Sequence, residues 1–137
     1  LFNACGDPLP VEEPEWMGPE IENMMESGAE VWQLVRMTGG LTGWETSGMD
    51  MMWQEAIVLQ KSGLFVKFRK SQKQTQQVSG NYEWDDHGLV LYYAEDSDMV
   101  GNCVNEPMER YQWYNHQLAG SWAACDGPGL YYKKLAR

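Results

Sequence analysis

Short segments that alternate between apolar and polar residues, separated by turn residues, recur along most of this chain. The clearest alternation is in residues 77–84, where Val78, Gly80, Tyr82 and Trp84 share one face. A period of two residues is typical of a β-strand with one buried face. The Asp-Asp-His-Gly sequence that follows is a hairpin-turn signal, and an apolar segment comes directly after it. The chain is therefore expected to fold mainly as antiparallel β-structure.

Eight segments have these strand features, and most of them are joined by short turns, which favours up-and-down connectivity. Eight strands can close into a barrel whose interior is filled by side chains or holds one small ligand. The predicted fold is all-β, an antiparallel up-and-down eight-stranded barrel with a short helix over residues 20–28, and a two-sheet β-sandwich is the alternative. The loop over residues 41–50 carries Trp44. The predicted strands are residues 31–37, 51–60, 64–69, 77–84, 89–94, 108–114, 118–124 and 130–135.

The acidic charge of the chain is concentrated at its N-terminus. Residues 1–30 contain eight carboxylates and no Lys or Arg, whereas residues 31–137 contain twelve acidic residues against ten basic ones. The stretch behind the first residues is rich in Pro and Glu and has the composition of an extended, self-repelling spacer. We therefore expect a tether over residues 1–19 and one domain over residues 20–137. A near-neutral domain lacks the basic face that nucleic-acid binding requires.

The five N-terminal residues, Leu-Phe-Asn-Ala-Cys, resemble the lipobox at the end of a bacterial lipoprotein signal peptide. The resemblance implies that Cys5 carries a lipid, with Ala4 as the small residue before it. No run approaches the roughly 18 apolar residues that span a bilayer, so we expect attachment through the lipid only. The predicted location is the bacterial cell envelope, anchored to the outer membrane and periplasmic or surface-exposed.

The chain contains three cysteines, so at least one of them cannot form a disulfide within the chain. The simplest partition gives the lipid to Cys5 and joins Cys103 to Cys125, which both lie beside turn residues. Such a bond would stabilise the fold by roughly 3 kcal/mol through the loop it closes. The alternative is three reduced thiols.

Several segments of the predicted domain carry a resemblance to a known family: an early strand tryptophan, a glycine turn into the third strand, and a closing tryptophan–cysteine segment before a final aromatic strand. They comprise Val31–Leu34, Gly63–Phe65, Ser79–Tyr82, Leu89–Tyr93, Trp122–Pro128 and Leu130–Leu135. In these segments the chain resembles the lipocalin-like lipoproteins of bacteria, within the calycin group of β-barrels. The resemblance implies a closed barrel and a tethered location, with Lys133, Lys134 or Arg137 as the basic residue over Trp32. A fold of this kind does not identify a ligand.

Residues that could perform catalysis are few. His87 and His116 are the only histidines, and both lie in short polar hairpin turns. Cys103 and Cys125 cannot act as nucleophiles if they are paired. Among the carboxylates that lie on predicted strands, Glu83 is on the polar face and neither it nor Glu55 is singled out by its neighbours. We therefore predict no catalytic residue and no enzymatic activity.

The sequence also predicts no metal and no cofactor. Two histidines without clustered cysteines do not give a zinc-binding spacing. Residues 95–102 superficially resemble a calcium loop but lack its glycine and its terminal glutamate, so a solvated acidic loop is expected. The basic run over residues 67–73 is expected to be the charged tip of a hairpin that protects a sheet edge. Contact with anionic lipid headgroups is the alternative for this run.

Aromatic residues are the main candidates for ligand binding. Eight of them either fill the barrel or line an apolar pocket inside it, and Trp44 is a candidate cap for the barrel mouth. The leading hypothesis is a monomeric, non-enzymatic envelope lipoprotein that binds a small hydrophobic ligand. The alternative is a protein-interaction or inhibitor module with a filled barrel. The candidate ligand-binding residues are Trp32, Trp44, Trp53, Tyr82, Trp84, Trp113, Trp122 and Tyr132.

Overall fold

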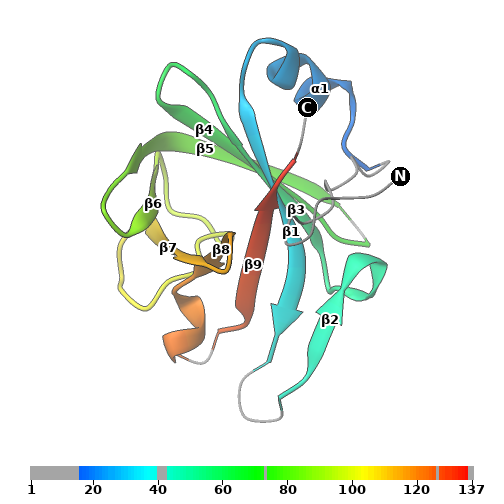
Figure 1. Cartoon of the computed structure of the whole chain (residues 1–137), viewed down its shortest axis with the longest axis vertical. Coiled ribbons are helices and arrows are strands. Elements are labelled where there is room, and N and C mark those ends of the chain that lie inside the picture. The colour runs from blue at the N-terminus through cyan, green and yellow to red at the C-terminus, as the bar shows by residue number, and fades with distance from the viewer. Residues whose placement is uncertain (1–15, 40–42, 73, 126, 136–137) are drawn as a thin grey trace.

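One strand closes the sheet of this protein into a barrel. β1 (Glu30–Thr38) pairs antiparallel with β3 (Gln54–Leu59) on one edge and with β9 (Gly129–Lys134) on the other. Figure 1 shows β9 beside β1. The other barrel strands follow in sequence order and all pair antiparallel: β4 (Leu64–Lys70), β5 (Thr75–Trp84), β6 (Gly88–Tyr93), β7 (Met108–Tyr114) and β8 (Gln117–Gly120).

The computed structural model describes residues 16–39, 43–72, 74–125 and 127–135. Its eight-stranded up-and-down barrel confirms the predicted fold, and the β-sandwich alternative is wrong. This architecture is compatible with the calycin-type barrel that the family resemblance implies. In the described part of the chain, no helix has the length and apolarity needed to cross a membrane.

A ninth strand, β2 (Glu45–Ser47), was not predicted. The first part of β1 pairs with β3 and its last part pairs with β2, while on the other edge its pairing with β9 is irregular between Leu34 and Arg36. The predicted loop over residues 41–50 therefore contains a strand and the 3-10 helix η1 (Gly48–Asp50). β3 begins later than predicted because the chain bends over residues 51–53 after η1, and the side chain of Gln54 donates to the carbonyl of Gly48 at 2.8 Å.

The predicted strand over residues 118–124 is also shorter than expected. β8 ends at Gly120, and the chain then turns into the 3-10 helix η2 (Trp122–Cys125). In this turn the amide of Ala124 is bonded to the carbonyl of Ser121 rather than to a neighbouring strand. The apolar residues of this segment therefore leave the barrel wall.

The short N-terminal helix is present as α1 (Pro19–Glu26). It ends before Gly28, whose φ of +95° is a conformation that favours glycine. α1 packs on the outside of the barrel, where Ile21 and Met25 meet outward-facing apolar residues of the wall such as Val58 and Val66. β3 and β4 are consequently buried on both faces. In Figure 1, β2 lies at the end of the molecule away from α1.

Because consecutive barrel strands are antiparallel, their connections alternate between two ends. At one end, short turns join β3 to β4, β5 to β6 and β7 to β8. At the other end lie the β4–β5 turn, the connection over residues 94–107 between β6 and β7, and η2 between β8 and β9. This second end is therefore built from the longer segments.

Candidate functional site

Four charged side chains point into the barrel and form a buried cluster. The interior charge cluster consists of Glu55 on β3, Lys67 and Arg69 on β4, and Glu109 on β7. The ammonium group of Lys67 lies 3.1 Å from Glu109 and 3.5 Å from Glu55, and Nε of Arg69 lies 2.7 Å from Glu55. β4 and β7 are not neighbours in the sheet, so these contacts cross the interior of the barrel.

Three buried tyrosines complete the hydrogen bonding of the two carboxylates. The hydroxyls of Tyr93 and Tyr111 donate to Glu109, the second at 2.6 Å, and that of Tyr132 donates to Glu55. Burial, together with the neighbouring carboxylate charges, raises the pKa of all three tyrosines well above its ordinary value. The phenols therefore stay neutral and act as donors over the physiological pH range.

The charges in the cluster also set the protonation of Glu55. Burial by itself raises the pKa of this carboxyl, but the charges of Lys67 and Arg69 and the hydrogen bonds from Tyr132 and Arg69 hold it below its ordinary value. Trp53 adds an indole N–H bond to Glu55 at 3.0 Å, and the Arg69 guanidinium lies 4.3 Å from the Trp53 ring centroid. The cluster is thus an internally paired set of two acids and two bases.

The cluster corrects the sequence interpretation of the basic run. Lys67 and Arg69 were expected at a solvent-facing hairpin tip, whereas both are buried inside the barrel. The apolar residues of the same strand, such as Val66 and Phe68, face outward because α1 covers them. Lys70, at the end of β4, is exposed as expected.

A loop closes the barrel end nearest this cluster. We call residues 94–107 the plug loop; its Met99 is almost completely buried. The carbonyl of Met99 accepts a bond from Lys67 at 3.0 Å, and the amide of Gly101 donates to Glu109 at 2.7 Å. The charge cluster therefore binds the backbone of the plug loop.

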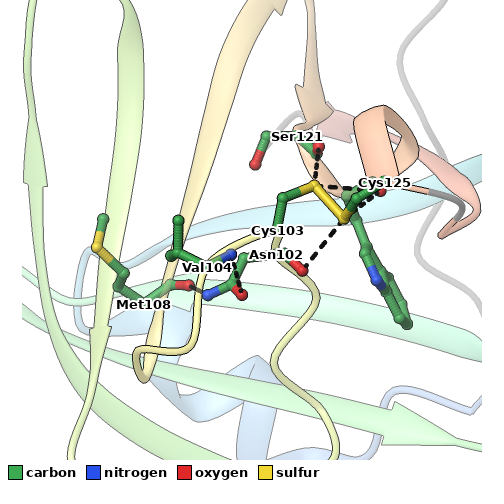
Figure 2. The surroundings of a disulfide bond; sticks show 7 residues. Asn102, Cys103, Val104, Met108, Ser121 and Cys125 are labelled. Atoms are coloured by element: carbon green, nitrogen blue, oxygen red, sulfur yellow. Dashed lines mark hydrogen bonds between the residues drawn. A yellow bond between two sulfur atoms is a disulfide. The ribbon is translucent and has the colours of Figure 1, made fainter.

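A disulfide ties the plug loop to η2. Cys103 and Cys125 form this bond, as predicted, with their Cα atoms 5.6 Å apart. Figure 2 shows it joining the plug loop to η2, beside the carbonyl of Ser121. Next to the bond, the side-chain amide of Asn102 donates to the carbonyls of Glu106 and Met108 and orders the end of the loop.

Trp122 packs between two glycines at this end. A Cβ atom added to Gly101 or to Gly127 would lie 2.3 or 2.2 Å from the Trp122 ring. Only glycine fits at both positions, so the plug loop and the segment after η2 are held against one indole. Packing, a disulfide and backbone hydrogen bonds all keep this end of the barrel closed.

The opposite end carries three tryptophans at inward-facing positions, which we call the tryptophan mouth. Trp32 is near the start of β1, Trp84 is the last residue of β5, and Trp113 is near the end of β7. Trp84 and Trp113 are stacked, with centroids 5.5 Å apart and planes 4° apart. Trp32 is 4% exposed, whereas Trp84 and Trp113 are 40% and 52% exposed.

The three ring centroids form a nearly equilateral triangle. The Trp32 centroid lies 5.7 Å from that of Trp113 and 6.1 Å from that of Trp84. If Trp32 covered the outer face of either stacked ring, its distance to the other ring would be much larger. Trp32 therefore lies against the edge of the pair and covers neither of its outer faces, and both stacked rings are about half exposed.

Charged and polar groups border the tryptophan mouth. The indole N–H of Trp32 donates to Glu30 at 3.1 Å, and the other carboxylate oxygen of Glu30 lies 3.7 Å from the ammonium group of Lys134. Lys134 is the strand partner of Trp32. Of the basic residues expected over Trp32, Lys134 is thus the one opposite it, and Arg137 lies outside the described residues.

The eight predicted ligand-binding aromatics do not share one pocket. Trp32, Trp84 and Trp113 meet at the tryptophan mouth, and Tyr82 packs against the interior core below them. Tyr132 belongs to the hydrogen-bonded interior, while Trp53 and Trp122 lie toward the plugged end. Trp44 lies before β2 with its indole against Gly39.

Trp53 also borders a concavity outside the barrel. A hollow of about 440 Å³ lies between η1 and the β4–β5 turn, and Trp16, Met49 and Met52 line it with Trp53. The indole nitrogen of Trp16 is buried there and has no hydrogen-bond partner among the described residues. This hollow is one alternative position for an apolar ligand.

The two histidines considered for catalysis or metal binding are exposed. His87 and His116 lie in the β5–β6 and β7–β8 turns. Within the described residues, no three His, Cys, Asp or Glu side chains are arranged to hold a metal ion. In the acidic loop over residues 95–102, Asp98 accepts a bond from Gln76 at 3.3 Å. Cys5 and the tether up to residue 15 lie outside the described residues.

Sequence reasoning missed the interior charge cluster. The sequence does contain a signal for it. On β4, Phe65, Lys67 and Arg69 alternate with three apolar residues and so share one face, and Glu109 shares a face of β7 with Tyr111. The sequence interpretation placed Lys67 and Arg69 at a hairpin tip and did not assign them to the interior face of β4. Comparison of the chain with protein-family models, curated proteins and solved structures found no match.

Proposed function

We propose that this protein is a non-enzymatic, lipid-anchored binding module of the bacterial cell envelope, related to the lipocalin-like lipoproteins. In this proposal its ligand is small, presents a flat apolar face, and binds at the tryptophan mouth. The observation that carries the proposal is the stacked and half-exposed pair of Trp84 and Trp113. Aromatic faces of this kind supply a large contact area at low entropic cost.

The interior of the barrel is a less favourable binding site than the tryptophan mouth. Side chains from opposite walls meet there, as in the Lys67–Glu109 pair, and the plug loop covers the far end. A ligand that entered would separate charges that are paired in a site of low dielectric, which is costly. The tryptophan mouth requires no such rearrangement.

The test is a screen of planar apolar compounds followed by intrinsic tryptophan fluorescence. We expect Trp84→Ala and Trp113→Ala to weaken the binding of any hit by at least about tenfold, the loss of roughly 1.4 kcal/mol of stacking. Trp44→Ala is the matched control, because Trp44 is similarly exposed at 38% but lies in the β1–β2 hairpin. An equal loss of affinity in the Trp44→Ala control would contradict the proposal. Hits whose affinity is unchanged by both mouth variants would contradict it as well. Near-ultraviolet circular dichroism checks that each variant is folded.

The anchor is tested separately. Cys5→Ala should move the protein from the membrane fraction to the soluble fraction, because a covalent lipid is the only attachment proposed. The matched control is Cys103→Ser, which removes a cysteine without touching the lipid site. If Cys5→Ala stays with the membranes, the anchor proposal is wrong.

The closely packed interior also favours a second candidate, a protein-interaction module that uses the barrel only as a scaffold. The exposed tryptophans of the mouth would then be the anchor residues of an interface, in which Trp is enriched. This candidate predicts that no small compound competes for the mouth, while Trp113→Ala abolishes cross-linking to one envelope protein. Displacement by a small ligand would argue against it.

A further inference from the structure

We infer that the tryptophan mouth binds a neutral saccharide ring, an inference that rests on the proposed binding at this mouth and names its ligand class. A pyranose ring has one face of C–H groups and a rim of hydroxyls. The mouth has the matching arrangement, with two stacked and half-exposed indole rings between polar turns.

The first argument is the partial exposure of the platform. Trp84 and Trp113 are half-exposed and lie at the barrel end rather than in an enclosed cavity. Sites for apolar small molecules bury some 70–90% of the ligand surface. A ligand that covers one indole face keeps its opposite side in water, so it needs one apolar side and one hydrated side. A saccharide ring has both.

The second argument is the polar rim. The amide of Trp113 is bonded to the carbonyl of His87 at 3.3 Å, which places the β5–β6 turn beside the Trp113 backbone. Asn115 and His116 form the next turn along β7 and are exposed. These turns supply imidazole and amide groups that can donate to and accept from ring hydroxyls.

The third argument is charge. Two cations at this end of the barrel are already paired, Lys134 with Glu30 and Arg110 with Asp85 at 2.9 Å, and Lys61 lies in the β3–β4 turn at the same end. Asp86, in the turn directly after Trp84, adds an exposed carboxylate. A phosphorylated or sulfated ligand would have to compete with Glu30 and Asp85 for the two paired cations, whereas an uncharged ring would not.

The experiment is a calorimetric titration of the whole chain with neutral gluco-, manno-, galacto- and N-acetylglucosamine oligosaccharides at millimolar concentration. We expect at least one series to bind, with affinity reduced at least tenfold by Trp113→Ala and unchanged by Trp44→Ala. Trp113→Phe, which keeps a ring, should retain most of the affinity. A sulfated form of the same oligosaccharide should bind at least tenfold more weakly.

Each other outcome decides against the inference. Planar aromatic compounds that bind in a Trp113-dependent way, without any saccharide binding, would leave the proposed site in place and overturn the saccharide. Absence of both would overturn the site and the saccharide together. Saccharide binding that Trp84→Ala and Trp113→Ala leave unchanged would place the sugar elsewhere and also overturn the inference.

Discussion

At the scale of single residues, the interior charge cluster decides how the barrel is packed. Lys67 contacts both carboxylates, the hydroxyl of Tyr93 and the carbonyl of Met99. Its removal would therefore leave several buried polar groups without a partner. A buried ion pair adds little stability over an apolar replacement of both partners, but loss of one partner is strongly destabilising.

Replacement of Lys67 should therefore be costly. Lys67→Met is expected to lower the free energy of unfolding by about 3–5 kcal/mol, because two buried carboxylates lose their shared cation. Arg110→Met, which breaks the exposed pair with Asp85, is the control and should cost less than about 1 kcal/mol. Urea unfolding measures both. Equal effects of the two substitutions would mean that the cluster is not internally paired.

The same cluster predicts the pH dependence of stability. The pKa of Glu55 is lowered on folding, so its contribution is present above the unfolded value near 4.5 and is lost as pH falls below it. The pKa values of Tyr93, Tyr111 and Tyr132 are raised, so their contribution is present below pH 10 and is lost as pH rises above it. Thermal unfolding across pH should show a plateau between these limits. Alkaline stability unchanged up to pH 12 would contradict the buried tyrosines.

At residue scale, the sequence predicted the disulfide and the inward phase of Tyr82 and Trp84, because a strict alternation assigns faces directly. It did not predict that Lys67 and Arg69 point inward. Both faces of β4 are buried, one against α1 and one inside the barrel, so a period of two cannot say which face is the interior. Of the two partner carboxylates, Glu55 comes from the adjacent strand β3, whereas Glu109 comes from β7, 42 positions along the chain from Lys67.

At the scale of elements, the plug loop makes the two ends of the barrel different. It is held by the charge cluster, by Trp122 against Gly101, and by the disulfide. The sequence predicted a loop here because its polar residues follow a strand, but not its position over the barrel end. That position depends on the buried Met99 and on contacts with strands distant in sequence.

Removal of the disulfide tests how firmly the plug loop is held. The bond joins residues separated by 22 positions, so Cys103→Ser with Cys125→Ser should lower the free energy of unfolding by about 3 kcal/mol. Amide hydrogen exchange should rise in the plug loop and η2 while the β1–β3 ladder stays protected. Uniformly increased exchange over the whole barrel would show that the bond stabilises the fold globally instead.

At the scale of the whole molecule, the barrel is plugged at one end and exposes stacked tryptophans at the other. The number and order of barrel strands were predictable, because short turns and alternating segments restrict the topology. The added strand β2 and the separation of the eight aromatics into different places were not predictable from the alternation, because they depend on strand register and on helix packing. We therefore propose that a ligand is recognised at the tryptophan mouth, whereas the contacts at the plugged end stabilise the fold.

The most direct test of this account is a heteronuclear NMR titration that follows the indole N–H signals, assigned with single tryptophan variants, as a bound ligand is added. We predict that the signals of Trp32, Trp84 and Trp113 shift while those of Trp53 and Trp122 stay in place. Shifts confined to Trp16 and Trp53 would instead place the ligand in the hollow beside η1, and shifts of Trp53 together with Trp122 would place it at the plugged end. Either result would contradict binding at the tryptophan mouth.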